Sequence, residues 1–128
     1  MKELTIEGYR KPVSKKNKMK FNRKHGRAYK DKSVREFEDW LFQLAEISVK
    51  HWEEQYNMAW DTNKKYKFIL EVTYGTKRKF DIQNCFDTMC DALEGIVFDD
   101  DSQITNIQGI KTYDKGIDKF RITVLPIV

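Results

Sequence analysis

Apolar and polar positions alternate in four short segments of the chain, a pattern typical of half-buried strands. The first is "ELTIEGY", residues 3–9, which ends at Gly8 shortly before Pro12. The clearest is "YKFILEVTY", residues 66–74, where one face carries Tyr66, Phe68, Leu70, Val72 and Tyr74. Near the C-terminus, "QITNIQGIKTY" and "KFRITVLPI" are two further strands, and we expect them to form a hairpin around "DKGID".

Helical spacing of apolar residues predicts two helices. The first should run from Ser33 to about Gln55, with an apolar stripe of Val34, Phe37, Trp40, Leu41, Leu44, Ile47 and Ser48. The second should run from about Asp81 to Leu93 and end before Gly95, a natural C-cap residue. Its apolar stripe is Ile82, Cys85, Phe86, Met89 and Leu93, whereas Gln83, Asp87 and Asp91 share an exposed side.

A basic segment separates the first strand from the first helix. Eleven of the 23 residues from Arg10 to Lys32 are Lys or Arg, only Asp31 is acidic, and "FNRKHGRAY" could form a small hairpin. The order is therefore strand, basic loop, helix, strand, helix, strand, strand. This order predicts an α+β fold, a small mixed β-sheet with two packed helices, in one domain spanning residues 1–128.

Composition indicates what class of protein this is and in which compartment it works. With 128 residues, 40% of them hydrophobic, the chain can build a core, and it has no apolar run of the length that spans a membrane. Cys85 and Cys90 are spaced so that their side chains diverge on a helix, which predicts free thiols in a reducing compartment. We therefore expect a cytoplasmic protein without a membrane partner.

Acidic residues gather in one stretch of an otherwise basic chain. Residues 77–104 contain six aspartates and one glutamate, although the formal net charge of the chain is +4. Taken singly, Asp81 could be a helix cap, and Asp99, Asp100 and Asp101 could be a solvated loop. If the strand after Asp101 pairs beside the strand ending at Tyr74, however, Asp81 and Asp101 could converge and bind Mg²⁺. With the basic loop holding phosphates, this arrangement would suit a metal-dependent nuclease.

Several motifs point to a known family. They are "FDIQN" at the start of the second helix, "DAL" at residues 91–93 and "DDSQI" at residues 100–104, together with the N-terminal strand, Lys/Arg-rich loop and amphipathic helix. From about Ile6 to Tyr113, the chain resembles the RusA family of Holliday-junction resolvases, endodeoxyribonucleases of bacteria and their prophages. The resemblance implies a homodimer that binds four-way DNA junctions and nicks two strands symmetrically with Mg²⁺ or Mn²⁺, in DNA recombination and repair. It makes Asp81 and Asp101 the catalytic metal ligands, with Asn84, Asp91 and Asp100 in supporting roles.

Two positions depart from the family pattern. The second catalytic aspartate of the pattern is Gln83 here, and its lysine is Asp87. Because Asp87 lies one helical turn from Gln83, we expect it to replace the lost carboxylate, so that Asp81, Asp87 and Asp101 hold the metal beside Gln83. Lys77, Lys79 or Lys111 would replace the missing lysine. The expected DNA-binding residues are Lys15, Lys16, Lys18, Lys20, Arg23, Lys24, Arg27, Lys30, Lys77, Arg78 and Lys79.

Two alternatives stay open at this point. A degenerate member of the family would bind branched DNA without cutting it. A small phage assembly or interaction protein would carry its acids only as surface residues. Metal binding, salt-dependent DNA binding and cleavage distinguish the three hypotheses.

Overall fold

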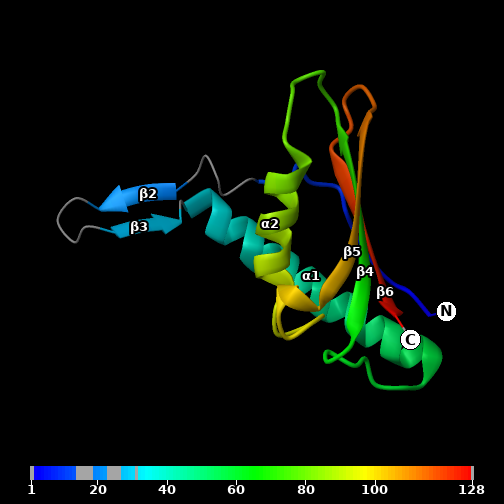
Figure 1. The fold of residues 1–128 in the computed structure, drawn as a ribbon. Helices are drawn as coiled ribbons and strands as arrows, with labels where there is room; N and C mark the ends of the chain where they lie inside the picture. The colour runs from blue at the N-terminus through cyan, green and yellow to red at the C-terminus, as the bar shows by residue number, and fades with distance from the viewer. Residues whose placement is uncertain (1, 14–18, 23–26, 31, 128) are drawn as a thin grey trace.

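The computed structural model describes residues 2–13, 19–22, 27–30 and 32–127. The helices α1 (Lys32–Tyr56) and α2 (Ile82–Leu93) cover one face of a four-stranded sheet and leave the other face open (Figure 1). The sheet consists of β1 (Leu4–Gly8), β4 (Lys65–Tyr74), β5 (Ile104–Tyr113) and β6 (Lys119–Ile127). A short 3₁₀ turn, η1 (Asp101–Gln103), precedes β5. The predicted α+β fold with two helices on a mixed sheet is confirmed.

The basic segment contains the small hairpin that the sequence suggested. Strands β2 (Met19–Asn22) and β3 (Arg27–Lys30) pair antiparallel, with Met19 opposite Lys30. The pair lies beyond the N-terminal end of α1, apart from the four-stranded sheet (Figure 1).

The strand order β1-β6-β4-β5 corrects one expectation about the C-terminal half. Strands β5 and β6 do not form a hairpin, because β4 lies between them, parallel to β5 and antiparallel to β6. The connecting turn instead crosses the end of β4. The Asp114 N–H donates to the Tyr74 carbonyl at 3.1 Å, and the Gly116 N–H donates to the Gly75 carbonyl at 3.0 Å. These two bonds use the carbonyl groups of the last residue of β4 and of the residue after it, and they direct the chain to the far side of β4.

The core lies between the sheet and the two helices. The predicted inward face of β4 is buried at all five positions, and it meets the buried positions of α1, which are Val34, Phe37, Leu41, Ala45, Val49 and Trp52. Ile47, expected in the stripe, is 66% exposed, because the 3.6-residue period places Ala45, Val49 and Trp52 in phase with Leu41 instead. Within the described residues, neither helix has a stretch long and apolar enough to cross a membrane.

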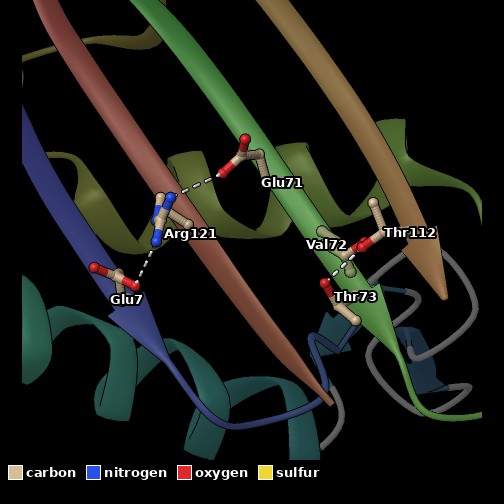
Figure 2. A network of polar contacts seen from close by, with 6 residues as sticks. All are labelled: Glu7, Glu71, Val72, Thr73, Thr112 and Arg121. Atoms are coloured by element: carbon tan, nitrogen blue, oxygen red, sulfur yellow. Dashed lines mark hydrogen bonds and ion pairs between the residues drawn. The ribbon is translucent and has the colours of Figure 1, made fainter. Parts of the chain in front are cut away.

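Polar contacts span the open face of the sheet (Figure 2). Arg121 on β6 lies between two acids, with Nη2 at 3.2 Å from Glu7 Oε2 on β1 and Nη1 at 3.7 Å from Glu71 Oε2 on β4. On the neighbouring pair of strands, the Thr73 and Thr112 hydroxyl oxygens are 2.6 Å apart. These contacts join all four strands on the face that no described helix covers.

Candidate functional site

Asp81 caps the N-terminal end of α2. Its backbone is extended, and its Oδ1 accepts a hydrogen bond from the Gln83 N–H at 2.9 Å. A carboxylate at this position satisfies one free N–H group of the first turn and interacts favourably with the helix dipole. The interpretation of Asp81 as a cap is therefore correct, and one of its oxygens already has a partner within the chain.

The exposed side of α2 carries the two residues that depart from the family pattern. Gln83 Nε2 donates to Asp87 Oδ1 at 3.1 Å, so the two residues lie one turn apart on the same face of the helix, as the sequence predicted. Both residues are exposed, and Asp91 continues the same row one turn later. Asn84 is half-buried, and its carbonyl accepts the Thr88 hydroxyl at 3.1 Å.

A tight turn at the C-terminal end of α2 brings three more acids together. Gly95 has φ +90°, a left-handed conformation that glycine adopts without strain, and its N–H donates to the Phe98 carbonyl at 2.8 Å. This reversal brings the following residues back beside Glu94, the C-cap residue of α2. Carboxylate oxygens of Glu94, Asp100 and Asp101 lie within 4.8 Å of one another. We call these three residues the acidic cluster.

Buried contacts hold this turn against the body of the protein. Trp60 Nε1 donates to the Val97 carbonyl at 2.8 Å, and the Asp99 N–H donates to the Thr62 carbonyl at 3.1 Å. Trp60 is only 8% exposed, so its indole bonds to the turn from inside the core. The loop after α1 therefore fixes the position of the acidic cluster.

Asp100 has a structural role inside the acidic cluster. It caps η1, where its carboxylate accepts hydrogen bonds from the Ser102 hydroxyl and the Ser102 N–H, while Gln103 Oε1 accepts the Asp100 N–H at 2.8 Å. The Ser102 hydroxyl, followed by the Ser102 N–H, lowers the pKa of the Asp100 carboxyl below its ordinary value. Asp100 is thus held in its charged form, which is the form that a cation requires.

The structure does not bring Asp81 and Asp101 together within one chain. Strands β4 and β5 are adjacent, as the hypothesis required, but they are parallel. Helix α2 and the segments that flank it must therefore lead from the C-terminal end of β4 back to the N-terminal end of β5, and the 12 residues of α2 extend about 18 Å. Asp81 precedes one end of α2, whereas Asp101 follows the other end.

Carboxylates of α2 and of the acidic cluster lie around one buried thiol. Burial raises the pKa of the Cys90 thiol, and the nearby carboxylates of Asp101, Asp87, Asp91 and Glu94 raise it further. Asp87 is therefore close enough to act on the same buried group as Asp101. Cys85 and Cys90 are both buried and free, as the sequence predicted.

The residues around the N-terminal end of α2, unlike those at its C-terminal end, are mainly basic. An open cleft of about 770 Å³ lies there, and its lining includes Asp81, Asn84 and the cations Lys11, Arg78 and Lys79. Lys111 on β5 reaches the same place, because its Nζ donates to the Phe80 carbonyl at 3.4 Å. Of the three lysines proposed to replace the family lysine, Lys111 therefore has a defined contact directly beside Asp81.

The predicted DNA-binding residues fall into three groups. Lys15, Lys16, Lys18, Arg23 and Lys24 lie outside the described residues. Lys20, Arg27 and Lys30 lie on the strands of the β2–β3 hairpin. Lys77, Arg78 and Lys79 are exposed in the segment between β4 and α2. This last group is the one that the described structure places beside Asp81.

Sequence reasoning missed Glu94 as a member of the acidic cluster. Its position three residues after Asp91, on the same side of the helix, was the available signal. The turn that folds Asp100 and Asp101 back to Glu94 depends on Trp60, which is distant in the sequence. No local pattern around Glu94 reports that contact.

The comparisons with known proteins agree with the motifs. The family model for endodeoxyribonuclease RusA matches residues 10–124, which is most of the chain. No curated protein matches the chain. The matched range includes the basic segment, both helices and the acidic cluster, and the chain belongs to the RusA endodeoxyribonuclease family.

Proposed function

We propose that this protein is a structure-selective endodeoxyribonuclease that resolves Holliday junctions by metal-dependent, symmetric nicking during DNA recombination and repair. The observation that carries the proposal is the family match over residues 10–124, which includes both the acidic side of α2 and the basic residues at its start. Acting on cellular DNA, the protein would work in the cytoplasm of a bacterium, encoded by its chromosome or by a prophage.

The acidic cluster fits a hard divalent cation. Glu94, Asp100 and Asp101 offer carboxylate oxygens within 4.8 Å of one another, and Mg²⁺ and Mn²⁺ prefer oxygen ligands. We propose that Asp101 and Glu94 hold the ion, that Asp100 supports them, and that Asp87 and Asp91 add negative charge along α2. When bound, such an ion activates water and stabilises the negative charge that develops on phosphate oxygens.

The basic residues at the start of α2 would hold the DNA backbone. Lys77, Arg78 and Lys79 are consecutive exposed cations, and phosphate contacts of this kind position a strand without reading its sequence. Asp81 would keep the N-terminal end of α2 in place by capping its first turn. Asn84 lines the cleft at this end of the helix. Lys111, beside the Phe80 carbonyl, takes the place of the family lysine in this proposal.

Cleavage of a synthetic four-way junction tests the proposal. The wild-type protein should nick two opposite strands in Mg²⁺ or Mn²⁺ and none in EDTA. Asp101→Asn and Asp81→Asn should each lose most of the activity, whereas Glu54→Gln, an exposed acid on α1, should retain it. If the wild-type protein cuts and both aspartate variants still cut, the site assignment is wrong.

A pair of substitutions tests whether Asp87 compensates for Gln83. Asp87→Lys should abolish cleavage, because it removes a carboxylate from the acidic side and breaks the contact with Gln83. Adding Gln83→Asp should restore part of the activity, since the double variant recovers the family arrangement. A double variant as inactive as Asp87→Lys alone would contradict the compensation.

Binding of branched DNA without cleavage is the second candidate function, and the two departures at Gln83 and Asp87 favour it. A protein of this kind would bind a four-way junction with strong salt dependence and leave it intact in every metal. The cleavage assay separates the two functions directly. A surface-only role for the acids predicts neither DNA binding nor stabilisation by Mn²⁺.

We also propose a homodimer, because a twofold protein matches a twofold junction. Among the described strands, β5 is a sheet edge of ten residues with Lys111 as its only charged side chain. A long edge with so little charge is suited to pairing with another chain. Sedimentation of the wild type should therefore give a dimer, and Ile107→Lys, at a half-exposed position on this edge, should give a monomer.

A further inference from the structure

A shallow pocket of about 420 Å³ lies where the C-terminal ends of β4 and β5 meet the segment leading to α2. Three aromatic residues line it, Tyr74, Phe80 and Tyr113. Its four charged residues are all cations, Lys77, Arg78, Lys79 and Lys111, and no acid is among the described residues that line it. We call it the aromatic pocket.

Two of the three rings of the aromatic pocket stack on each other. Tyr74 and Phe80 stack with ring centroids 3.7 Å apart and an interplanar angle of 26°. Tyr74 is 5% exposed and belongs to the core, so it supports Phe80 from below. Tyr113 is 46% exposed, which leaves a large part of its ring open to solvent.

Lysine ammonium groups rest on these rings. Lys111 Nζ lies 5.3 Å from the centroid of Phe80, and Lys77 Nζ lies 5.6 Å from the centroid of Tyr113. A cation on an exposed ring gains only about 0.5–1 kcal/mol, so a ligand that stacks better can displace it. The displaced ammonium would remain in the pocket, where it can pair with an anionic part of the same ligand.

We propose that the aromatic pocket binds one unpaired nucleotide of a DNA strand. The base stacks between Phe80 and Tyr113, and the flanking phosphates contact Lys77, Arg78 and Lys79. Flat rings beside consecutive cations suit a base and its phosphates, and this combination binds single strands with little sequence preference. The inference rests on the proposed function, and it adds that the protein engages an unstacked nucleotide rather than duplex backbone alone.

Duplex DNA cannot occupy the pocket in this way. Its bases stack on one another and offer no free face to a protein ring, whereas bases at a branch point or in a single strand can. Phe80 directly precedes Asp81, so a nucleotide held here would direct its strand toward the cleft that Asp81 and Asn84 line. The pocket would thus position the strand at the basic end of α2.

Two oligomers of equal charge isolate the stacking contribution. One is single-stranded oligothymidine, and the other has the same number of phosphates but abasic sugars. Fluorescence anisotropy at low salt should give the wild-type protein about tenfold tighter binding to oligothymidine, a typical gain for stacking one base. Tyr113→Ala and Phe80→Leu should each reduce this preference to less than about threefold, with binding to the abasic oligomer unchanged.

Two control variants make the test specific. Tyr9→Ala, at a tyrosine that is 82% exposed and lies outside the pocket, should keep the full preference. Lys79→Ala should weaken binding to both oligomers equally, because it removes a phosphate contact. Equal binding of the two oligomers by the wild type, or a preference that survives both aromatic substitutions, would overturn the inference.

The cleavage assay keeps this inference separate from the proposed function. A protein that cuts junctions but shows no preference for oligothymidine contradicts the pocket alone. A protein that shows the preference, loses it in both aromatic variants and cuts nothing contradicts the nuclease proposal alone.

Discussion

Replacing Trp60 by phenylalanine should destabilise the protein by about 2–4 kcal/mol. The substitution removes the Nε1–H that bonds to the Val97 carbonyl at 2.8 Å, and the buried carbonyl is left without that donor. An unsatisfied buried acceptor costs about 1–3 kcal/mol. The smaller ring also loses contact with Trp52, whose ring centroid is 4.9 Å away, and with the stacked Tyr66, which adds about 1 kcal/mol.

Thermal and urea unfolding measure this loss. A chain of this size should lose about 4 °C of Tm per kcal/mol, so we expect a decrease of about 8–16 °C. Hydrogen exchange should accelerate at Gly95 and Val97, because their amides belong to the turn that Trp60 holds. The matched control is Trp40→Phe. Among the described residues, the Trp40 indole packs on Phe37 and Phe120 and makes no Nε1 hydrogen bond, so this substitution affects ring contacts alone. If both variants lose the same stability and Gly95 exchanges no faster, the hydrogen bond does not hold the turn.

Three further predictions concern other parts of the fold. Gly8→Ala should cost about 1–3 kcal/mol in urea unfolding, because a Cβ there would lie 2.6 Å from Trp40 Cη2 and 2.9 Å from Phe120 Cζ; a loss under 0.5 kcal/mol would contradict it. Asp100→Asn should lower Tm at neutral pH but not in strong acid. The pKa of Asp100 is lowered in the folded protein, so its charged carboxylate stabilises the fold at neutral pH, and this stabilisation is lost as the pH falls through the lowered pKa. A difference in Tm that persists in strong acid would show that the charge of Asp100 is not the reason. Arg121→Met should change the free energy of unfolding by less than about 1 kcal/mol, because the ion pairs with Glu7 and Glu71 are solvent-exposed, and a larger loss would show that the pairs couple the strands.

Periodicity predicted most of the fold because each helix and strand buries one face. The alternation in residues 66–74 gave the inward side of β4 correctly, and the helical spacing in residues 82–93 gave the buried side of α2. Ile47 was misplaced because it follows the buried Leu41 by six residues, which puts it about 120° around the helix from the buried face. Periodicity indicates which residues are buried. Burial is enough to predict where helices and strands lie in the sequence, but not the order of the strands in the sheet.

The order of strands was harder to predict, because adjacent segments with a short connection usually pair. Between β5 and β6 the connection is short, yet β4 separates them. The decisive contacts are backbone bonds from Asp114 and Gly116 to the end of β4, which depend on where β4 already lies. Backbone bonding of this kind leaves no pattern in side-chain types, so the hairpin was the natural expectation and was wrong.

The same topology separates two chemistries that the sequence placed in one site. Because β4 and β5 are parallel, α2 carries a basic cleft with Asp81 at its start and the acidic cluster with Asp101 after its end, about 18 Å of helix apart. One ion therefore cannot contact both aspartates of a single chain. Asp101→Asn should abolish the increase in Tm that Mn²⁺ gives, whereas Asp81→Asn should retain it while lowering the affinity for junction DNA. Equal loss of the Mn²⁺ effect in both variants would mean that the two ends meet on one ion, with the second aspartate supplied by another copy of the chain.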